Sequence, residues 1–199
     1  MIGSVVAQFE ITHRIGEGGM GVVYKAQDTK LGRTVALKFL TRLGTDEETH
    51  ARFLAEARTA AALDHPGICP IYEFGEHEDQ AFIVMASVEG QTLAERIKDG
   101  DVPVADAVDW VRQAAEAIGA AHDQGIVHRD IKPGNLIVDP RGRLRVLDFG
   151  LARFLGSAHM TTAGGTVGTA AYMSPEQARG ETVDHRSDIW GLGRRTGTD

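Results

Sequence analysis

The sequence is poor in cysteine, in basic charge and in long apolar runs. Cys69 is the only cysteine among the 199 residues, which rules out an internal disulfide and a cysteine-rich zinc site. The formal net charge is −7, whereas proteins that bind nucleic acid through its phosphates usually carry an excess of basic residues. We therefore expect no nucleic-acid partner. No apolar stretch approaches the roughly 20 residues of a membrane span, and the N-terminus lacks the pattern of a cleaved signal. We therefore expect a soluble, cytoplasmic protein without a membrane segment.

The apolar pattern predicts an α+β protein whose first part is a small sheet. Residues 9–40 predict an antiparallel meander, because runs rich in β-branched residues alternate with turn residues. A helix is expected to follow, with Thr45 as N-cap and Glu48 completing a capping box, and to stop before Pro66. Short strands are expected at 68–73 and 81–86. About five strands and one helix would then precede Gly90.

The second part of the chain is predicted to be mainly helical. Apolar positions recur every three or four residues in one long stretch and predict an amphipathic helix that ends at Gly125. Its expected apolar stripe comprises Val104, Val108, Val111, Ala115, Ile118 and His122. Short strands are predicted at 126–127, 136–138 and 144–147, and a long loop at 155–171.

A glycine cluster in the first part is a candidate phosphate-binding loop. Gly16, Gly18 and Gly21 match the spacing GxGxxG. In a dinucleotide-binding enzyme this motif opens a helix, whereas here the strand-forming residues 22–24 follow it. A glycine loop between two strands, folded over phosphates, is therefore favoured, since backbone amides must approach anionic oxygens closely. A plain hairpin turn and a nicotinamide-dependent oxidoreductase remain as alternatives.

Three further motifs occur in a fixed order along the chain. They are residues 128–135 (HRDIKPGN), residues 148–150 (DFG) and residues 174–176 (SPE), and a VALK sequence places Lys38 in a predicted strand. With these residues the chain resembles the protein Ser/Thr kinase family, and most of all the bacterial eukaryotic-type kinases. The resemblance implies a two-lobed kinase-like fold and transfer of the ATP γ-phosphoryl group to Ser or Thr hydroxyls.

The resemblance also implies a role for each motif residue. The three loop glycines would cover the ATP phosphates, and Lys38 would hold them while paired with Glu56. Asp130 would accept the substrate proton and Lys132 would contact the γ-phosphate, while Asn135 and Asp148 would hold Mg²⁺. The adenine would lie among apolar side chains and hinge backbone groups, namely Ile15, Val23, Ala36, Met85, Ala86, Val88 and Ile137.

A protein substrate is the implied partner, and the chain itself is a candidate. Thr161, Thr162 and Thr166 lie on the predicted loop before the SPE motif, and a phosphate there could dock on Arg129. For each single threonine, an ordinary solvated loop residue is the alternative. Lysine two residues after Asp130 is the Ser/Thr rather than the tyrosine-kinase pattern.

The end of the sequence departs from the family pattern. Residues 187–193 resemble the start of the central helix of the large lobe, but residues 194–199 do not continue it. We therefore expect an N-terminal lobe at 9–88, a partial, C-terminally truncated lobe at 89–193 and an atypical tail at 194–199. The alternative function is that of an inactive or weakly active kinase remnant that at most binds nucleotide.

Overall fold

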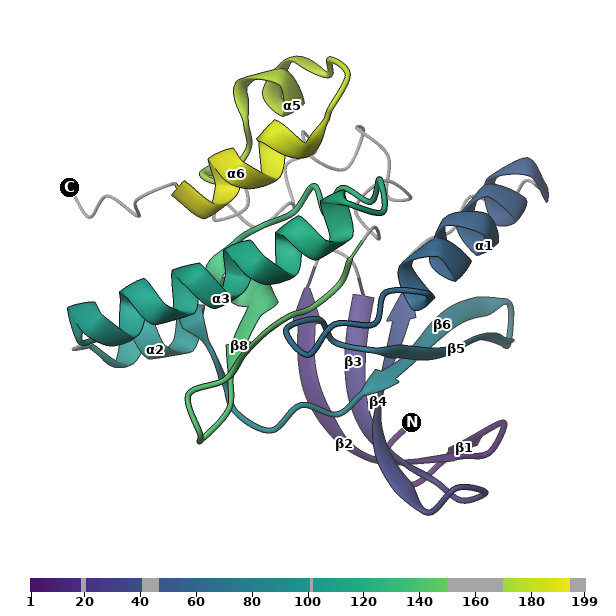
Figure 1. Cartoon of the computed structure of the whole chain (residues 1–199). Coiled ribbons are helices and arrows are strands. Elements are labelled where there is room, and N and C mark those ends of the chain that lie inside the picture. The colour runs from purple at the N-terminus through teal and green to yellow at the C-terminus, as the bar shows by residue number, and fades with distance from the viewer. Residues whose placement is uncertain (19–20, 41–46, 101, 150–169, 194–199) are drawn as a thin grey trace. The chain divides into compact units, whose positions relative to one another are not determined.

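The computed structural model describes residues 1–18, 21–40, 47–100, 102–149 and 170–193, without the side chains of residues 47–52 and 56. These residues form two compact units (Figure 1). The first consists of residues 1–62 and 70–87, and the second of residues 63–69 and 88–199.

The first unit is built on a six-stranded antiparallel sheet with the order β1-β2-β3-β4-β6-β5. Its strands are β1 (Val5–Val6), β2 (Phe9–Gly18), β3 (Gly21–Asp28), β4 (Arg33–Leu40), β5 (Ile71–His77) and β6 (Gln80–Ala86). The strands β2, β3 and β4 form the predicted meander, and β6 lies against β4.

Aromatic side chains fill the core of this sheet. The ring of Phe39 on β4 lies 5.7 Å from that of Phe82 on β6, and Phe9 approaches Phe82 edge-on at 6.4 Å. Helix α1 (Glu47–Ala61) packs on β5 through Phe53, whose ring meets that of Phe74 at 5.7 Å. Aromatic pairs of this kind add to the burial of the rings themselves, and the tilted Phe39–Phe82 pair supports the register of β4 and β6.

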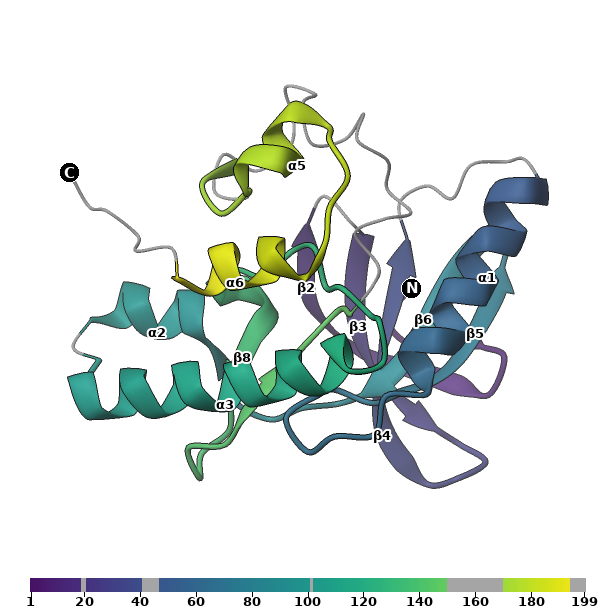
Figure 2. The ribbon, with the colours of Figure 1, turned by 45° about the horizontal axis from the view of Figure 1, so that its top comes forward.

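The second unit combines helices with a small sheet of order β7-β8-β9. Its helices and strand β8 can be followed in Figure 2. Its elements are β7 (Gln91–Thr92), α2 (Leu93–Asp99), α3 (Val104–His122), the 3₁₀ turn η1 (Pro133–Asn135), β8 (Leu136–Val138), β9 (Leu144–Val146), α5 (Pro175–Arg179) and α6 (His185–Gly193). One apolar core joins α3 to the strands and to the loop before η1.

The structure corrects the predicted face of α3. Trp110, Ala114, Ala117 and Ala121 are buried, whereas Val104 is 79% and Val108 64% exposed. Of the predicted stripe, Ile118 alone is among the buried core residues. The buried face is made largely of small side chains, which let the helix backbone approach its neighbours closely.

Several short elements also differ from the prediction. Strand β5 starts at Ile71 rather than residue 68, because Ile68 bridges Val146 in the second unit. Residues 126–127 form no strand. The short elements β1, β7, α2 and α5 were not predicted. Thr45, and most of the predicted loop at 155–171, lie outside the described residues.

Gly21 is expected to be the loop glycine that the fold itself requires. Its φ is +142°, and a Cβ there would lie 1.8 Å from the carbonyl oxygen of Phe39. We expect Gly21→Ala to lower the free energy of unfolding by about 1–3 kcal/mol, because both the clash and the dihedral oppose a side chain. Urea denaturation measures this change.

Gly18→Ala is the matched control, because a Cβ at Gly18 would meet no atom within 4 Å in the described part of the chain beyond its own neighbours. This variant is expected to change the free energy of unfolding by less than about 1 kcal/mol. Equal destabilisation by the two variants would contradict the assignment.

Candidate active site

The first unit places the predicted phosphate-binding lysine in the middle of its sheet. Lys38 lies on β4, opposite Val23 on β3 and Ile83 on β6, and is only 4% exposed. Beside it, Ala36 faces Met85 across the β4–β6 pair, and both are buried. Lysine is rarely buried this deeply, and its positive charge makes the ammonium group a candidate anion-binding group.

The predicted phosphate loop joins β2 to β3. Gly16 lies opposite Val23, and Gly18 lies opposite Gly21. Among the described residues other than their chain neighbours, no atom lies within 4 Å of the position that a Cβ on Gly16 or Gly18 would take, so these backbones are accessible to a ligand. Ile15, which precedes them, is 56% exposed.

The remaining predicted residues of this unit are placed less completely. Glu56 lies on α1, but its side chain is outside the described residues. The amide of Ala86 donates to the carbonyl of Pro70, just before β5, at 3.0 Å, so this N–H is already used within the first unit. Val88 belongs to the second unit.

The second unit brings Asp130, Lys132 and Asn135 together. The Lys132 ammonium lies 2.7 Å from Oδ2 of Asp130. The Asn135 amide nitrogen donates to the same carboxylate oxygen at 2.9 Å and to the backbone carbonyl of Asp130 at 2.8 Å. The η1 turn makes this possible, since it carries Asn135 back toward the aspartate five residues earlier. Asp130 is 93% buried, so its carboxylate orientation is fixed by these donors.

His128 holds the backbone of the same loop from inside the core. Its ring is fully buried and packs edge-on against Phe149, with the ring centroids 4.7 Å apart. Nε2 lies 2.7 Å from the carbonyl oxygen of Leu147, and Nδ1 accepts from the amide of Asp130 at 3.2 Å. These two contacts together require a neutral ring that is protonated on Nε2.

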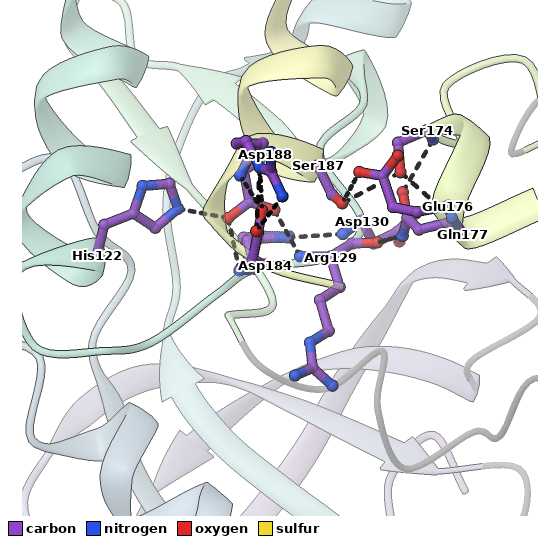
Figure 3. A network of polar contacts seen from close by, with 11 residues as sticks. His122, Arg129, Asp130, Ser174, Glu176, Gln177, Asp184, Ser187 and Asp188 are labelled. Carbon is purple, nitrogen blue, oxygen red and sulfur yellow. Dashed lines mark hydrogen bonds and ion pairs between the residues drawn. The ribbon is translucent and has the colours of Figure 1, made fainter. Parts of the chain in front are cut away.

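Asp188 on α6 is the central acceptor of the site (Figure 3). Its Oδ2 accepts from the His128 amide at 2.8 Å, and its Oδ1 accepts from the Arg129 amide at 2.7 Å. Nε2 of His122 on α3 lies 2.7 Å from Oδ2. The carboxylate is almost fully buried, yet these donors satisfy it. Arg129 is held with φ of +70°, a conformation that costs free energy for a residue with a side chain.

Asp148 and Asn135 offer the oxygen atoms that Mg²⁺ prefers. Asp148 follows β9 with φ of +61° and is partly exposed. The amide nitrogen of Asn135 is taken up by Asp130, which leaves the amide oxygen as the atom to bind a cation. One carboxylate and one amide oxygen, with water completing the shell, fit a magnesium site. Ile137 lies on β8, opposite Arg145.

Helices α5 and α6 are joined by a short polar network. Ser187 on α6 donates to a carboxylate oxygen of Glu176 on α5. Its hydroxyl also accepts from that of Ser174 at 3.1 Å. The hydrogen bond from Ser187 lowers the pKa of Glu176 below its ordinary value. Nearby, hydrogen bonds from Arg186 lower the pKa of Asp184 to about 2.

Three residues of this site were not predicted from the sequence. Asp188 appeared there only as the start of a helix, and His122 as part of an apolar stripe. Gln177 on α5, whose side-chain amide donates to the carbonyl of Arg129 at 2.7 Å, did not appear at all. The only hint of these residues in the sequence was the consecutive Ser187 and Asp188, which lie in the stretch that resembles the central helix of the large lobe. The residues that the structure describes contain no cluster of three or more His, Cys, Asp or Glu suited to a metal. In the same residues, no helix has the length and apolarity to cross a membrane.

Comparison with known proteins decides the family. The protein kinase domain family matches residues 9–195. The chain belongs to the protein kinase family. This kinase-family chain is 42% identical to the serine/threonine-protein kinase PknB of Mycobacterium leprae over 193 residues, which are 94% of the chain and 31% of that relative. It is 44% identical to the serine/threonine-protein kinase PrkC of Bacillus subtilis over 191 residues, which are 95% of the chain and 30% of that relative.

Solved structures agree with the assignment of the fold. The kinase domain of Mycobacterium tuberculosis PknI matches with a TM-score of 0.78 and 29% identity, over 96% of this chain and 72% of that one. The predicted kinase-like α+β fold is therefore confirmed. The kinase-family chain spans about a third of the length of these two curated relatives.

Removing the Ser187 hydroxyl is expected to weaken the α5–α6 network in a pH-dependent way. Glu176 has a lowered pKa in the folded chain, so its contribution to stability is present above its unfolded pKa and is lost as the pH falls through the folded one. Ser187→Ala is expected to lower the melting temperature at pH 7 and to lower it less near pH 3. Thermal melts at both values measure it. Ser4→Ala, which removes an exposed hydroxyl, is the control. If Ser187→Ala lowers the stability equally at both pH values, the link between this hydrogen bond and the ionisation of Glu176 is contradicted.

Proposed function

We propose that this chain is an ATP- and Mg²⁺-dependent serine/threonine kinase domain. The observation that carries the proposal is the buried Asp130, which is oriented by Lys132 and Asn135. The names of the relatives in Mycobacterium leprae and Bacillus subtilis support a Ser or Thr hydroxyl as the acceptor. We also propose that residues 9–88 and 89–193 form the two kinase lobes, which differ from the two compact units in that residues 63–69 and Val88 belong to the second unit.

The first unit would bind the nucleotide. Lys38 would neutralise phosphate oxygens from its buried position on β4, and Glu56 would pair with it. The open backbones of Gly16 and Gly18 would approach the phosphates, and Gly21 would close the loop. Adenine would be enclosed by apolar side chains and hinge backbone groups, namely Ile15, Val23, Ala36, Met85, Ala86, Val88 and Ile137.

The second unit would supply the chemical groups. The substrate hydroxyl would donate its proton to Asp130 as its oxygen attacks the γ-phosphorus, and ADP would leave. Lys132 would stabilise charge on the γ-phosphoryl oxygens. Asn135 and Asp148 would hold Mg²⁺, which neutralises charge on the phosphates when bound. Catalysis of this kind depends on positioning and electrostatics more than on covalent chemistry.

Asp130→Asn is expected to abolish most transfer while ATP·Mg binding persists. The amide cannot accept the hydroxyl proton, so kcat should fall by about 10²–10⁴-fold. Transfer of labelled phosphate to a Ser/Thr protein measures the rate, and calorimetry measures binding of ATP·Mg against NAD. Asp109→Asn, which alters an exposed carboxylate on α3, is the control.

Equal turnover by the Asp130→Asn variant and the wild type would overturn the role of Asp130. Binding of ATP·Mg without any transfer in the wild type would favour the nucleotide-binding remnant. Binding of NAD in place of ATP would revive the oxidoreductase alternative.

Self-phosphorylation is expected on the segment that joins the DFG and SPE motifs. Thr161, Thr162 and Thr166 lie there, outside the described residues. A phosphate adds a charge of about −1.5 to −2, which the guanidinium of Arg129 could bind. Mass spectrometry after incubation with ATP·Mg should locate phosphate on this segment. The Asp130→Asn variant should carry none, and phosphate confined to other segments would contradict this route.

A further inference from the structure

One peptide plane, between Arg129 and Asp130, is held at both of its polar edges. The N–H of Asp130 donates to Nδ1 of His128 at 3.2 Å. The carbonyl of Arg129, on the opposite edge, accepts from the side-chain amide of Gln177 at 2.7 Å (Figure 3). A peptide plane fixed at both edges cannot rotate, so the direction in which Asp130 leaves the backbone is fixed as well.

Gln177 uses the two ends of its amide for two different tasks. It is the third residue of α5, and its Oε1 accepts from the backbone N–H of Ser174 at 3.0 Å, which closes a capping box. Its Nε2 makes the contact with Arg129. Glutamate at this position could close the capping box equally well, but its carboxylate has no hydrogen to donate. The second contact therefore needs an amide, and the first does not.

The contact is partly buried. Gln177 and Asp130 line the same small pocket, together with Tyr172, Met173 and Ser187. The backbone at Arg129 is also in the left-handed region, with φ of +70°, so it relaxes readily once a restraint is lost.

We propose that Gln177 is a positioning residue for Asp130, acting through the carbonyl of Arg129. The proposal deepens the proposed kinase function and rests on it for its kinetic consequences. Because the amide touches neither nucleotide nor hydroxyl in this scheme, its loss should lower kcat and leave the KM for ATP unchanged.

Gln177→Glu separates the two tasks of the side chain. We expect kcat to fall by about 10–100-fold, because the carboxylate repels the carbonyl that the amide held. The melting temperature should stay close to that of the wild type, since the capping box persists. The ratio of variant to wild-type kcat should rise as the pH falls toward 5, because a protonated carboxyl donates again. Gln177→Leu removes the donor without adding charge and should also lower kcat.

Glu95→Gln is the matched control. Glu95 closes the capping box of α2 with Thr92, and its carboxylate accepts from the Thr92 amide at 2.8 Å. The same exchange of amide and carboxylate there should leave kcat unchanged. In an Asp130→Asn background, Gln177→Glu should cause no further loss, because a positioning residue acts only through the group it positions.

Amide hydrogen exchange gives a readout that needs no turnover. In Gln177→Glu the amide of Asp130 should exchange faster than in the wild type, while amides of α2 keep their rates. Unchanged exchange at Asp130, or a full kcat in Gln177→Leu, would overturn the proposal. Absence of transfer in the wild type would instead overturn the proposed function, and the exchange comparison would still decide the positioning.

Discussion

The buried carboxylate of Asp188 is the constraint on which the second unit depends. It accepts hydrogen bonds from the amides of His128 and Arg129, which lie about sixty residues earlier in the chain. A buried carboxylate without such donors would be costly, so the helix and the loop stabilise each other. Gly191 allows the close packing that this needs, since a Cβ there would lie 2.8 Å from the carbonyl oxygen of Ile131.

The two units position their polar groups by different physical means. In the first unit, strand register alone places Lys38 at the centre of a sheet whose aromatic core fixes the strands. In the second unit, Asp130 lies in a loop, and side chains from α5, α6 and η1 hold that loop by its backbone. Register is insensitive to most single side chains, whereas a loop held by hydrogen bonds depends on each of its donors and acceptors.

The elements with a clear period were predictable from the sequence. The long strands β2, β3, β4 and β6 and the helices α1 and α3 have apolar patterns long enough to show it. Short elements such as β1, β7 and α5 were missed, because five residues or fewer are too few to show a periodic spacing of apolar residues. The face of α3 was predicted wrongly, since its valines are more apolar than the alanines that the structure buries. The sequence pattern reports only the hydrophobicity of each position, whereas the close packing of α3 in the structure requires small side chains on its buried face.

The sequence by itself determined the family, and it pointed to the residues that are proposed to carry the chemistry. The order of the glycine loop, Lys38 and the HRD, DFG and SPE motifs was sufficient for that, because each motif is local. Only the tertiary structure showed what holds Asp130 in place. The contacts of Asp188 and Gln177 with the loop join residues 48–60 positions apart, and no local pattern encodes such pairs. Hydrogen bonds of this kind depend on distance and direction in space, which arise only when the chain has folded.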